Sequence, residues 1–207
     1  SMVSALKIRS TVFKAFRDYW TNLDFTEIQS PSFTTTACEG GSTLFNVSYD
    51  DENEKSGQKF YAYLSQSWQL YAEATMFGLE NIFTLAPSFR AEKSRTRRHL
   101  TEFWHAEVES AWLHNHQMME LEEGMIVYIL KEVLSSNRAE LEFLGRDISV
   151  LENIKAPFDK MKYEDVLDKL NSMGFDLGWG DDFGYKEEKA LTQELESPLY
   201  ITNFPRE

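Results

Sequence analysis

Two segments in the middle of the chain constrain its fold most strongly. NIFTLAPSFR (81–90) and TEFWHAEVESAW (101–112) both alternate between apolar and polar residues. Such alternation is typical of β-strands, in which successive side chains point to opposite faces. The connecting segment, 92–101, is longer than the roughly two to five residues of an ordinary hairpin. We therefore expect two antiparallel strands joined by a long loop that carries several cations.

Strand parity divides the side chains of the second segment between two faces. One face holds Phe103, His105, Glu107 and Glu109, and the other holds Trp104, Ala106, Val108 and Trp112. We expect the Trp104 face to be the core face. By the same parity, Arg90 of the first segment lines the polar face together with Glu107.

The residues of this polar face suit a nucleotide. Arg90 can bind a carboxylate or a phosphate through two parallel hydrogen bonds. Phe103 offers a flat surface on which a base can stack. The alternative is a solvated strand face whose charges pair with one another, because surface pairs of that kind are common and weak.

Helical and strand-like segments surround this pair, which indicates an α+β fold. The periodicity predicts helices at 3–23, 65–79, 116–134, 162–174 and 185–195, and further strands at 25–29, 60–64 and 197–204. Ser65 or Ser67 can cap the second helix. We divide the chain into a core (1–150), a small helical insertion (151–196) and a returning core strand (197–207).

Composition excludes several classes of protein. Cys38 is the one cysteine, so an intrachain disulfide is impossible and a reducing compartment is expected. No apolar run reaches the roughly 18 residues that cross a membrane, and no signal peptide is apparent, so we expect a cytoplasmic protein without a membrane partner. A net charge of −13 restricts nucleic-acid contacts to a local basic patch, of which 93–98 is the candidate. No metal-ligand set is predicted.

Several ordered motifs resemble those of class II aminoacyl-tRNA synthetases. FRAE, followed by a basic loop and RHLTEF, is similar to their second motif, and FTEIQSPSF (25–33) resembles the first motif, which ends in a proline and builds the dimer interface. TACEGGSTLF, YLSQSWQLYAEA and LTQELESPLYITNFP extend the similarity over nearly the whole chain. They resemble the aspartyl/asparaginyl branch, and the archaeal-type asparaginyl enzymes most. The resemblance implies an antiparallel sheet flanked by helices.

This resemblance also implies a role for each matching residue. Arg90 is the catalytic residue, binding the amino-acid carboxylate and the α-phosphate of ATP. Glu92 and Phe103 hold adenine, Arg98 or His99 reaches the outer phosphates, Glu39 and Gln69 bind the α-ammonium, Glu107 belongs to the amino-acid pocket, and Pro31 lies at a homodimer interface. The implied partners are an amino acid, ATP and tRNA. The ligands of Mg²⁺ are expected outside this chain.

The choice between asparagine and aspartate depends on charge. Aspartyl enzymes typically carry a lysine within QLYKQ, and Ala72 stands at that position here, in QLYAE. An ionised aspartate beside Glu39, Glu73 and Glu107 would then be buried without a counter-charge. This favours asparagine and an asparagine–tRNA ligase. An aspartyl-tRNA synthetase relative and an archaeal-type asparagine synthetase are the alternatives.

The motifs of the family are incomplete in this sequence. The third motif, which brings an arginine for ATP, should follow Pro205, and the anticodon-binding domain should precede the chain. By itself the chain is therefore expected to lack part of the ATP site. It is either a fragment of a larger enzyme or a truncated, non-catalytic paralogue that acts as a binding or regulatory dimer.

Overall fold

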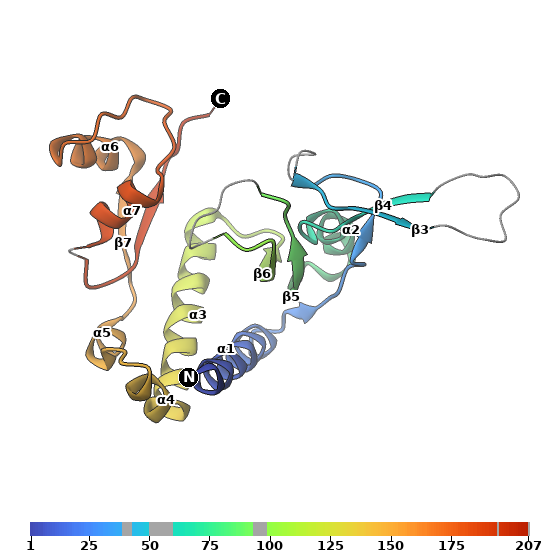
Figure 1. Ribbon diagram of the computed structural model, residues 1–207, viewed down its shortest axis with the longest axis horizontal. Coiled ribbons are helices and arrows are strands. Elements are labelled where there is room, and N and C mark those ends of the chain that lie inside the picture. Colours follow the sequence, from blue (N-terminus) through green and yellow to red (C-terminus); the bar gives the residue numbers. More distant parts are fainter. Residues whose placement is uncertain (39–42, 50–59, 93–98, 194, 207) are drawn as a thin grey trace, which may run out of the picture. The chain divides into compact units, whose positions relative to one another are not determined.

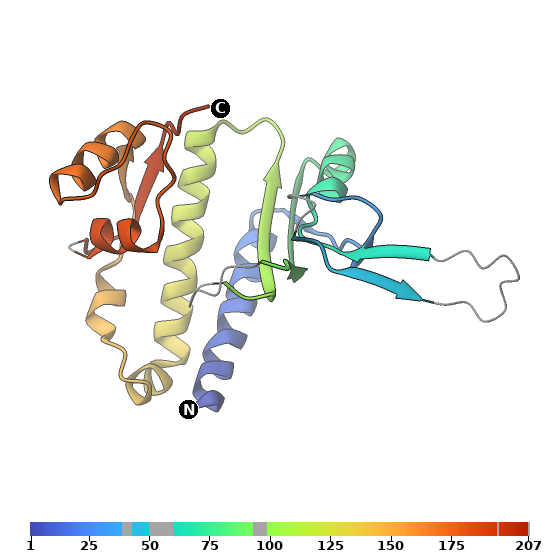
Figure 2. The same ribbon diagram turned by 45° about the horizontal axis from the view of Figure 1, so that its top comes forward.

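The computed structural model describes residues 1–38, 43–49, 60–92, 99–193 and 195–206. It divides into two compact units, Arg17–Leu113 and Ser1–Phe16 with His114–Glu207. Helices and sheets occur in both units, as the α+β prediction requires (Figures 1 and 2). The predicted boundaries at 150 and 196 do not coincide with this division and stay predictions. No helix in the described ranges is long and apolar enough to cross a membrane.

The main sheet of the Arg17–Leu113 unit has the strand order β1-β5-β6. Strand β1 (Thr26–Glu27) pairs in parallel with β5 (Asn81–Phe89), and β5 pairs antiparallel with β6 (Glu102–Ser110). The predicted antiparallel pair is therefore confirmed. Because Ser88 lies opposite Phe103 and Thr84 opposite Glu107, the two strands share one polar face, as parity indicated.

The other face of β6 corrects a prediction. Trp104, expected in the core, is 44% exposed, and Trp112 is 85% exposed. In β5, by contrast, both faces are buried, with Phe83 and Thr84 each at 0% exposure. Parity decides which side chains share a face, but another layer must cover that face before it becomes a core. For Trp104, the described residues supply only part of such a cover.

Helix α2 (Gln69–Leu79) packs on β5 through a small apolar cluster of Trp68, Ala72 and Ile82. The N-cap of α2 is Trp68, which makes no side-chain capping hydrogen bond, so neither Ser65 nor Ser67 is the cap residue that the sequence suggested. Ser67, one residue earlier, still accepts a hydrogen bond from the Gln69 amide at 3.1 Å. A second sheet has the order β2-β4-β3, formed by β2 (Phe33–Thr34), β4 (Phe60–Leu64) and β3 (Asn46–Tyr49).

Proline explains why the strand predicted at 25–29 is short. The structure assigns only Thr26–Glu27 to β1, and the chain continues past Pro31 into β2 of the other sheet. Proline has no amide proton for a ladder, so it ends pairing and lets the chain change sheets. Near the start of this segment, Arg17 of helix α1 (Met2–Asn22) fixes β1, because its Nε lies 3.0 Å from Oε1 of Glu27.

The second unit joins a helical layer to a small αβ module. Helices α3 (Asn115–Ser136), α4 (Arg138–Phe143) and α5 (Ile148–Asn153) bury Val133, Leu141 and Ile148, against which Ile8 and Val12 of α1 pack. Strands β7 (Asp159–Lys162) and β8 (Leu199–Thr202) pair in parallel, and α6 (Tyr163–Ser172) and α7 (Tyr185–Thr192) complete the module. Its core comprises Tyr163, Val166, Leu167, Leu170, Phe183 and Leu191.

Candidate nucleotide and amino-acid site

Arg90 and Phe103 meet at the end of the β5–β6 pair. Arg90 directly follows β5, and its amide donates to the Thr101 carbonyl at 3.0 Å, which continues the ladder by one residue. Parity then puts both side chains on the polar face. The guanidinium carbon of Arg90 lies 5.5 Å from the centre of the Phe103 ring, within the range of a cation–π contact.

A pocket of about 280 Å³ opens beside this pair. It is lined by Arg90, Glu92, His99, Leu100 and Phe103. The structure thus gathers an arginine, a carboxylate, an imidazole and an aromatic ring, the side chains that sequence analysis assigned to ATP. Arg98, the other residue assigned to the outer phosphates, lies outside the described residues. A flat ring with an acceptor and two basic groups beside it can hold a base and its phosphates.

Glu107 lies on the same face of β6 as Phe103, four residues further along the strand. Its side chain contacts the residues that precede the first turn of α2. The Ser67 hydroxyl donates to its Oε1, and the Trp68 amide donates to its Oε2 at 3.4 Å. A carboxylate is favoured at a helix N-terminus, where the unpaired amide groups carry partial positive charge. These contacts fix Glu107 on the first turn of α2, beside a cavity of about 40 Å³ that Ser67 and Ser88 also line.

His105 connects the two predicted subsites and received no role from the sequence. Its ring centroid is 5.4 Å from that of Phe103, and its Nδ1 is 3.1 Å from Oε2 of Glu107. Nδ1 also lies 3.4 Å from the Ser88 hydroxyl. The signal that could have identified His105 is its parity, which puts it between Phe103 and Glu107 on one face.

Gln69, predicted to bind an α-ammonium group, is the first residue of α2. Its side-chain Nε2 donates to Oε1 of Glu73 at 3.3 Å, and its Oε1 accepts from the Cys38 thiol at 3.4 Å. Its backbone amide shares the Ser67 hydroxyl with Glu107. The structure therefore brings Gln69 and Glu107 to one serine. Glu39, the other predicted ammonium ligand, lies outside the described residues.

Negative charge accumulates between α2 and β6. Burial raises the pKa of Glu109, and the neighbouring carboxylates of Glu107 and Glu73 raise it further. Where the chain is described, no group of three or more histidine, cysteine, aspartate or glutamate side chains could hold a metal ion. The arrangement is one that attracts a small organic cation, such as an ammonium group.

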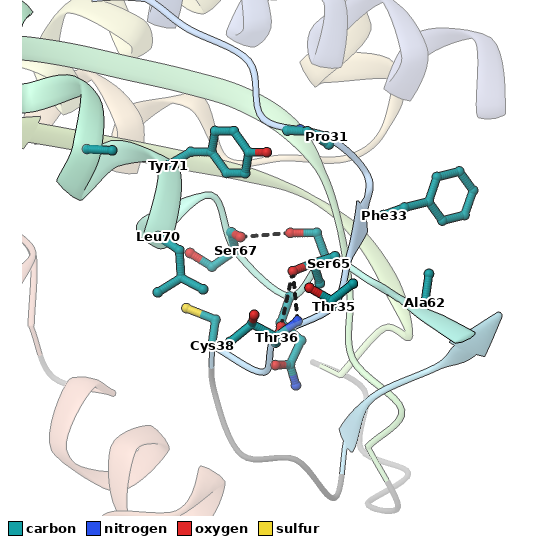
Figure 3. Close-up of a pocket in the computed structure, with 13 residues that line it drawn as sticks. Pro31, Phe33, Thr35, Thr36, Cys38, Ala62, Ser65, Ser67, Leu70 and Tyr71 are labelled. Carbon is teal, nitrogen blue, oxygen red and sulfur yellow. Dashed lines mark hydrogen bonds between the residues drawn. The ribbon is translucent and has the colours of Figure 1, made fainter. Parts of the chain in front are cut away.

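Pro31 lies in a different part of the unit from the Arg90 pocket. It lines a pocket of about 490 Å³ together with Phe33, Cys38, Leu70 and Tyr71 (Figure 3). Figure 3 also shows the hydrogen bond, 2.8 Å long, that the Ser65 hydroxyl donates to the Ser67 carbonyl in the wall of this pocket. Phe33 is 60% exposed, so the rim presents apolar surface.

Comparisons with known proteins extend over the entire chain. Residues 1–207 match the model of the family described as tRNA synthetases class II (D, K and N). The asparagine–tRNA ligase of Thermoplasma acidophilum is 47% identical over 204 residues, which are 99% of this chain and 46% of that protein. The chain thus spans about half the length of the curated relatives that it matches.

Solved structures agree with this comparison. The crystal structure of asparaginyl-tRNA synthetase from Pyrococcus horikoshii complexed with asparaginyl-adenylate has a TM-score of 0.90 and 42% identity, with 98% of this chain and 45% of that chain covered. The aspartyl-tRNA synthetase from Entamoeba histolytica has a TM-score of 0.72 and 25% identity, with 98% and 38% covered. Identity is therefore higher to the asparaginyl enzyme.

Proposed function

The chain belongs to the family of class II tRNA synthetases (D, K and N), and on this premise we propose that it is part of an asparaginyl-tRNA synthetase. In this proposal, the complete protein activates asparagine with ATP and transfers it to tRNA. The observation that carries the proposal is the pocket that Arg90, Glu92, His99 and Phe103 line together. The Pyrococcus relative, solved with asparaginyl-adenylate, matches 98% of this chain with a TM-score of 0.90.

Each side chain of the pocket has a part in the proposed binding of ATP. The Phe103 ring stacks on adenine, and Glu92 accepts a hydrogen bond from the base. Arg90 binds the α-phosphate from the end of β5, and His99 and Arg98 reach the outer phosphates. Because Arg90 also stands over the Phe103 ring, the ring orients the guanidinium as well as the base.

The chemical step requires positioning and charge stabilisation more than a general base. The carboxylate of asparagine attacks the α-phosphorus, and pyrophosphate leaves as the phosphoanhydride bond breaks. Arg90 holds the attacking carboxylate and the phosphoryl oxygens together. When bound, Mg²⁺ would neutralise charge on the outer phosphates. The described residues form no acidic cluster that fits this ion, so its ligands are not assigned to this chain.

The amino-acid subsite favours a neutral side chain. Gln69 and Glu39 receive the α-ammonium group, and Glu107, which is joined to Gln69 through Ser67, belongs to the same amino-acid pocket. Burial raises the pKa of Glu109, and the negative charges of Glu107 and Glu73 raise it further. The same negative charges would repel the side-chain carboxylate of aspartate. Ala72 supplies no cation to offset it. Asparagine, which has the same shape without the charge, avoids this cost.

The remaining partners follow from the same assignment. We propose a cytoplasmic homodimer that contacts tRNA through the basic segment 93–98. The exposed apolar rim of the pocket beside Pro31 supports an interface there, because large exposed apolar patches are typical of interaction surfaces.

Pyrophosphate exchange on the complete protein tests this function. With ATP present, labelled pyrophosphate should enter ATP when asparagine is added, with far less exchange for aspartate. Exchange that depends on aspartate rather than asparagine would contradict the substrate assignment. If no amino acid supports exchange, and calorimetry detects no ATP binding, the protein is a non-catalytic paralogue instead.

A further inference from the structure

One glutamate beside the amino-acid subsite binds no ligand in the function proposed above. Glu73 lies one helical turn after Gln69 on the same side of α2, and its Oε1 accepts a hydrogen bond from Gln69 Nε2 at 3.3 Å. At its other end, the Gln69 amide accepts from the Cys38 thiol at 3.4 Å. The amide of Gln69 is therefore held from both sides.

The chemistry of these contacts determines which end of the amide is presented. A carboxylate can only accept hydrogen bonds, so Glu73 attracts the NH₂ group of Gln69 and directs the carbonyl oxygen away from itself. An α-ammonium group can only donate, so it requires that oxygen. With the amide reversed, Nε2 would face the ammonium group and no hydrogen bond could form. The orientation set by Glu73 is the one that binds an amine.

Electrostatics support the same role. Burial raises the pKa of Glu109, and the carboxylates of Glu107 and Glu73 raise it further. The negative charge of Glu73 therefore lies beside the subsite between α2 and β6, where the Gln69 amide presents its NH₂ group to it.

We propose that Glu73 is a positioning residue that orients the side-chain amide of Gln69 toward the α-ammonium group of the amino-acid substrate. This inference rests on the function proposed above. Glu73 acts through Gln69 and does not touch the substrate. The competing view is that the two side chains form only a surface pair on the helix, as residues four apart often do.

Steady-state pyrophosphate exchange on the complete protein separates these views. Glu73→Ala should raise the KM for asparagine about tenfold, the effect of one lost orienting hydrogen bond, and leave the KM for ATP unchanged. Glu73→Gln can still accept through its own carbonyl oxygen, so it should recover most of that loss. Glu142→Ala is a matched control, because Glu142 also belongs to a pair of side chains four residues apart. Its Oε1 lies 3.6 Å from Nε of Arg138. This variant should keep both KM values.

A double-mutant cycle with Gln69→Ala provides the decisive readout. If Glu73 acts through Gln69, then Glu73→Ala should have no further effect on the KM for asparagine once Gln69 is gone. An equal effect in both backgrounds, or an unchanged KM in Glu73→Ala, would overturn this inference while wild-type exchange with asparagine still supports the proposed function. Absence of asparagine-dependent exchange in the wild type would overturn the proposed function, and this inference with it.

Discussion

The guanidinium carbon of Arg90 stands 5.5 Å from the centre of the Phe103 ring, across the end of the β5–β6 pair. The contact joins a residue that follows one strand to a residue near the start of the next, and the ladder between Arg90 and Thr101 holds the two strands in register. Cation and ring are thereby fixed before any ligand binds. Preorganised groups of this kind lose little freedom when they meet a charged transition state.

Replacing Phe103 tests the aromatic half of this arrangement. In the complete protein, we expect Phe103→Leu to raise the KM for ATP about tenfold, because base stacking on an aromatic side chain contributes roughly 1–3 kcal/mol. The KM for asparagine should change little. Pyrophosphate exchange gives both constants, with Phe103→Tyr as the control that keeps the ring. Equal KM values for ATP in the two variants would contradict a stacking role.

Ser67 joins Gln69, a predicted ammonium ligand, to Glu107 of the amino-acid pocket. Ser67→Ala leaves a half-buried carboxylate and the Gln69 amide without this hydroxyl, so we expect a loss of about 1–3 kcal/mol in stability. It should also raise the KM for asparagine. Ser110→Ala is the control, because its hydroxyl donates to Asn81 at the far end of the strand pair. Denaturant unfolding should show a loss of stability in both variants. If the KM for asparagine also rose in both, that would count against a specific role for Ser67.

Sequence alternation predicted the strands well, because apolar and polar residues alternate with the same two-residue period as the side chains of a paired strand. Alternation at 81–90 and 101–112 was sufficient for the β5–β6 pair, and parity placed Phe103 and Glu107 on one face. The partners of those residues were less accessible to sequence reasoning. Ser67 and Glu107 are 40 residues apart, and only the packing of α2 on β5 brings them together. The exposure of Trp104 was missed because it depends on which layer covers the strand.

The pKa of Glu109 predicts how stability depends on pH. Burial and the charges of Glu107 and Glu73 raise this pKa above its ordinary value of 4.5, so the folded state holds the proton more tightly than the unfolded state. Stability from this group is therefore present below pH 4.5 and is lost as pH rises through the raised pKa. Glu109→Gln cannot ionise, so it removes this contribution to the pH dependence of stability.

Thermal unfolding across a pH series measures this dependence. Relative to the wild type, Glu109→Gln should gain in Tm as the pH rises from about 4 to 7, because only the wild type acquires an unfavourable buried charge. Glu120→Gln, an exposed position on α3, serves as the control and should show no such trend. A constant difference in Tm for Glu109→Gln at every pH would contradict the assignment.

Ala72 provides a test of the amino-acid subsite that depends on packing. The lysine of aspartyl enzymes would stand at this position, yet Ala72 is 1% exposed and packs with Trp68 and Ile82 between α2 and β5. Ala72→Lys must displace these side chains, so we expect a loss of about 1–3 kcal/mol in stability and no gain of aspartate-dependent exchange. Ala74→Lys, an exposed position on the same helix, should keep wild-type stability. If Ala72→Lys were as stable as Ala74→Lys and supported exchange with aspartate, the lysine would have space beside the substrate. Charge at this single position would then decide the specificity.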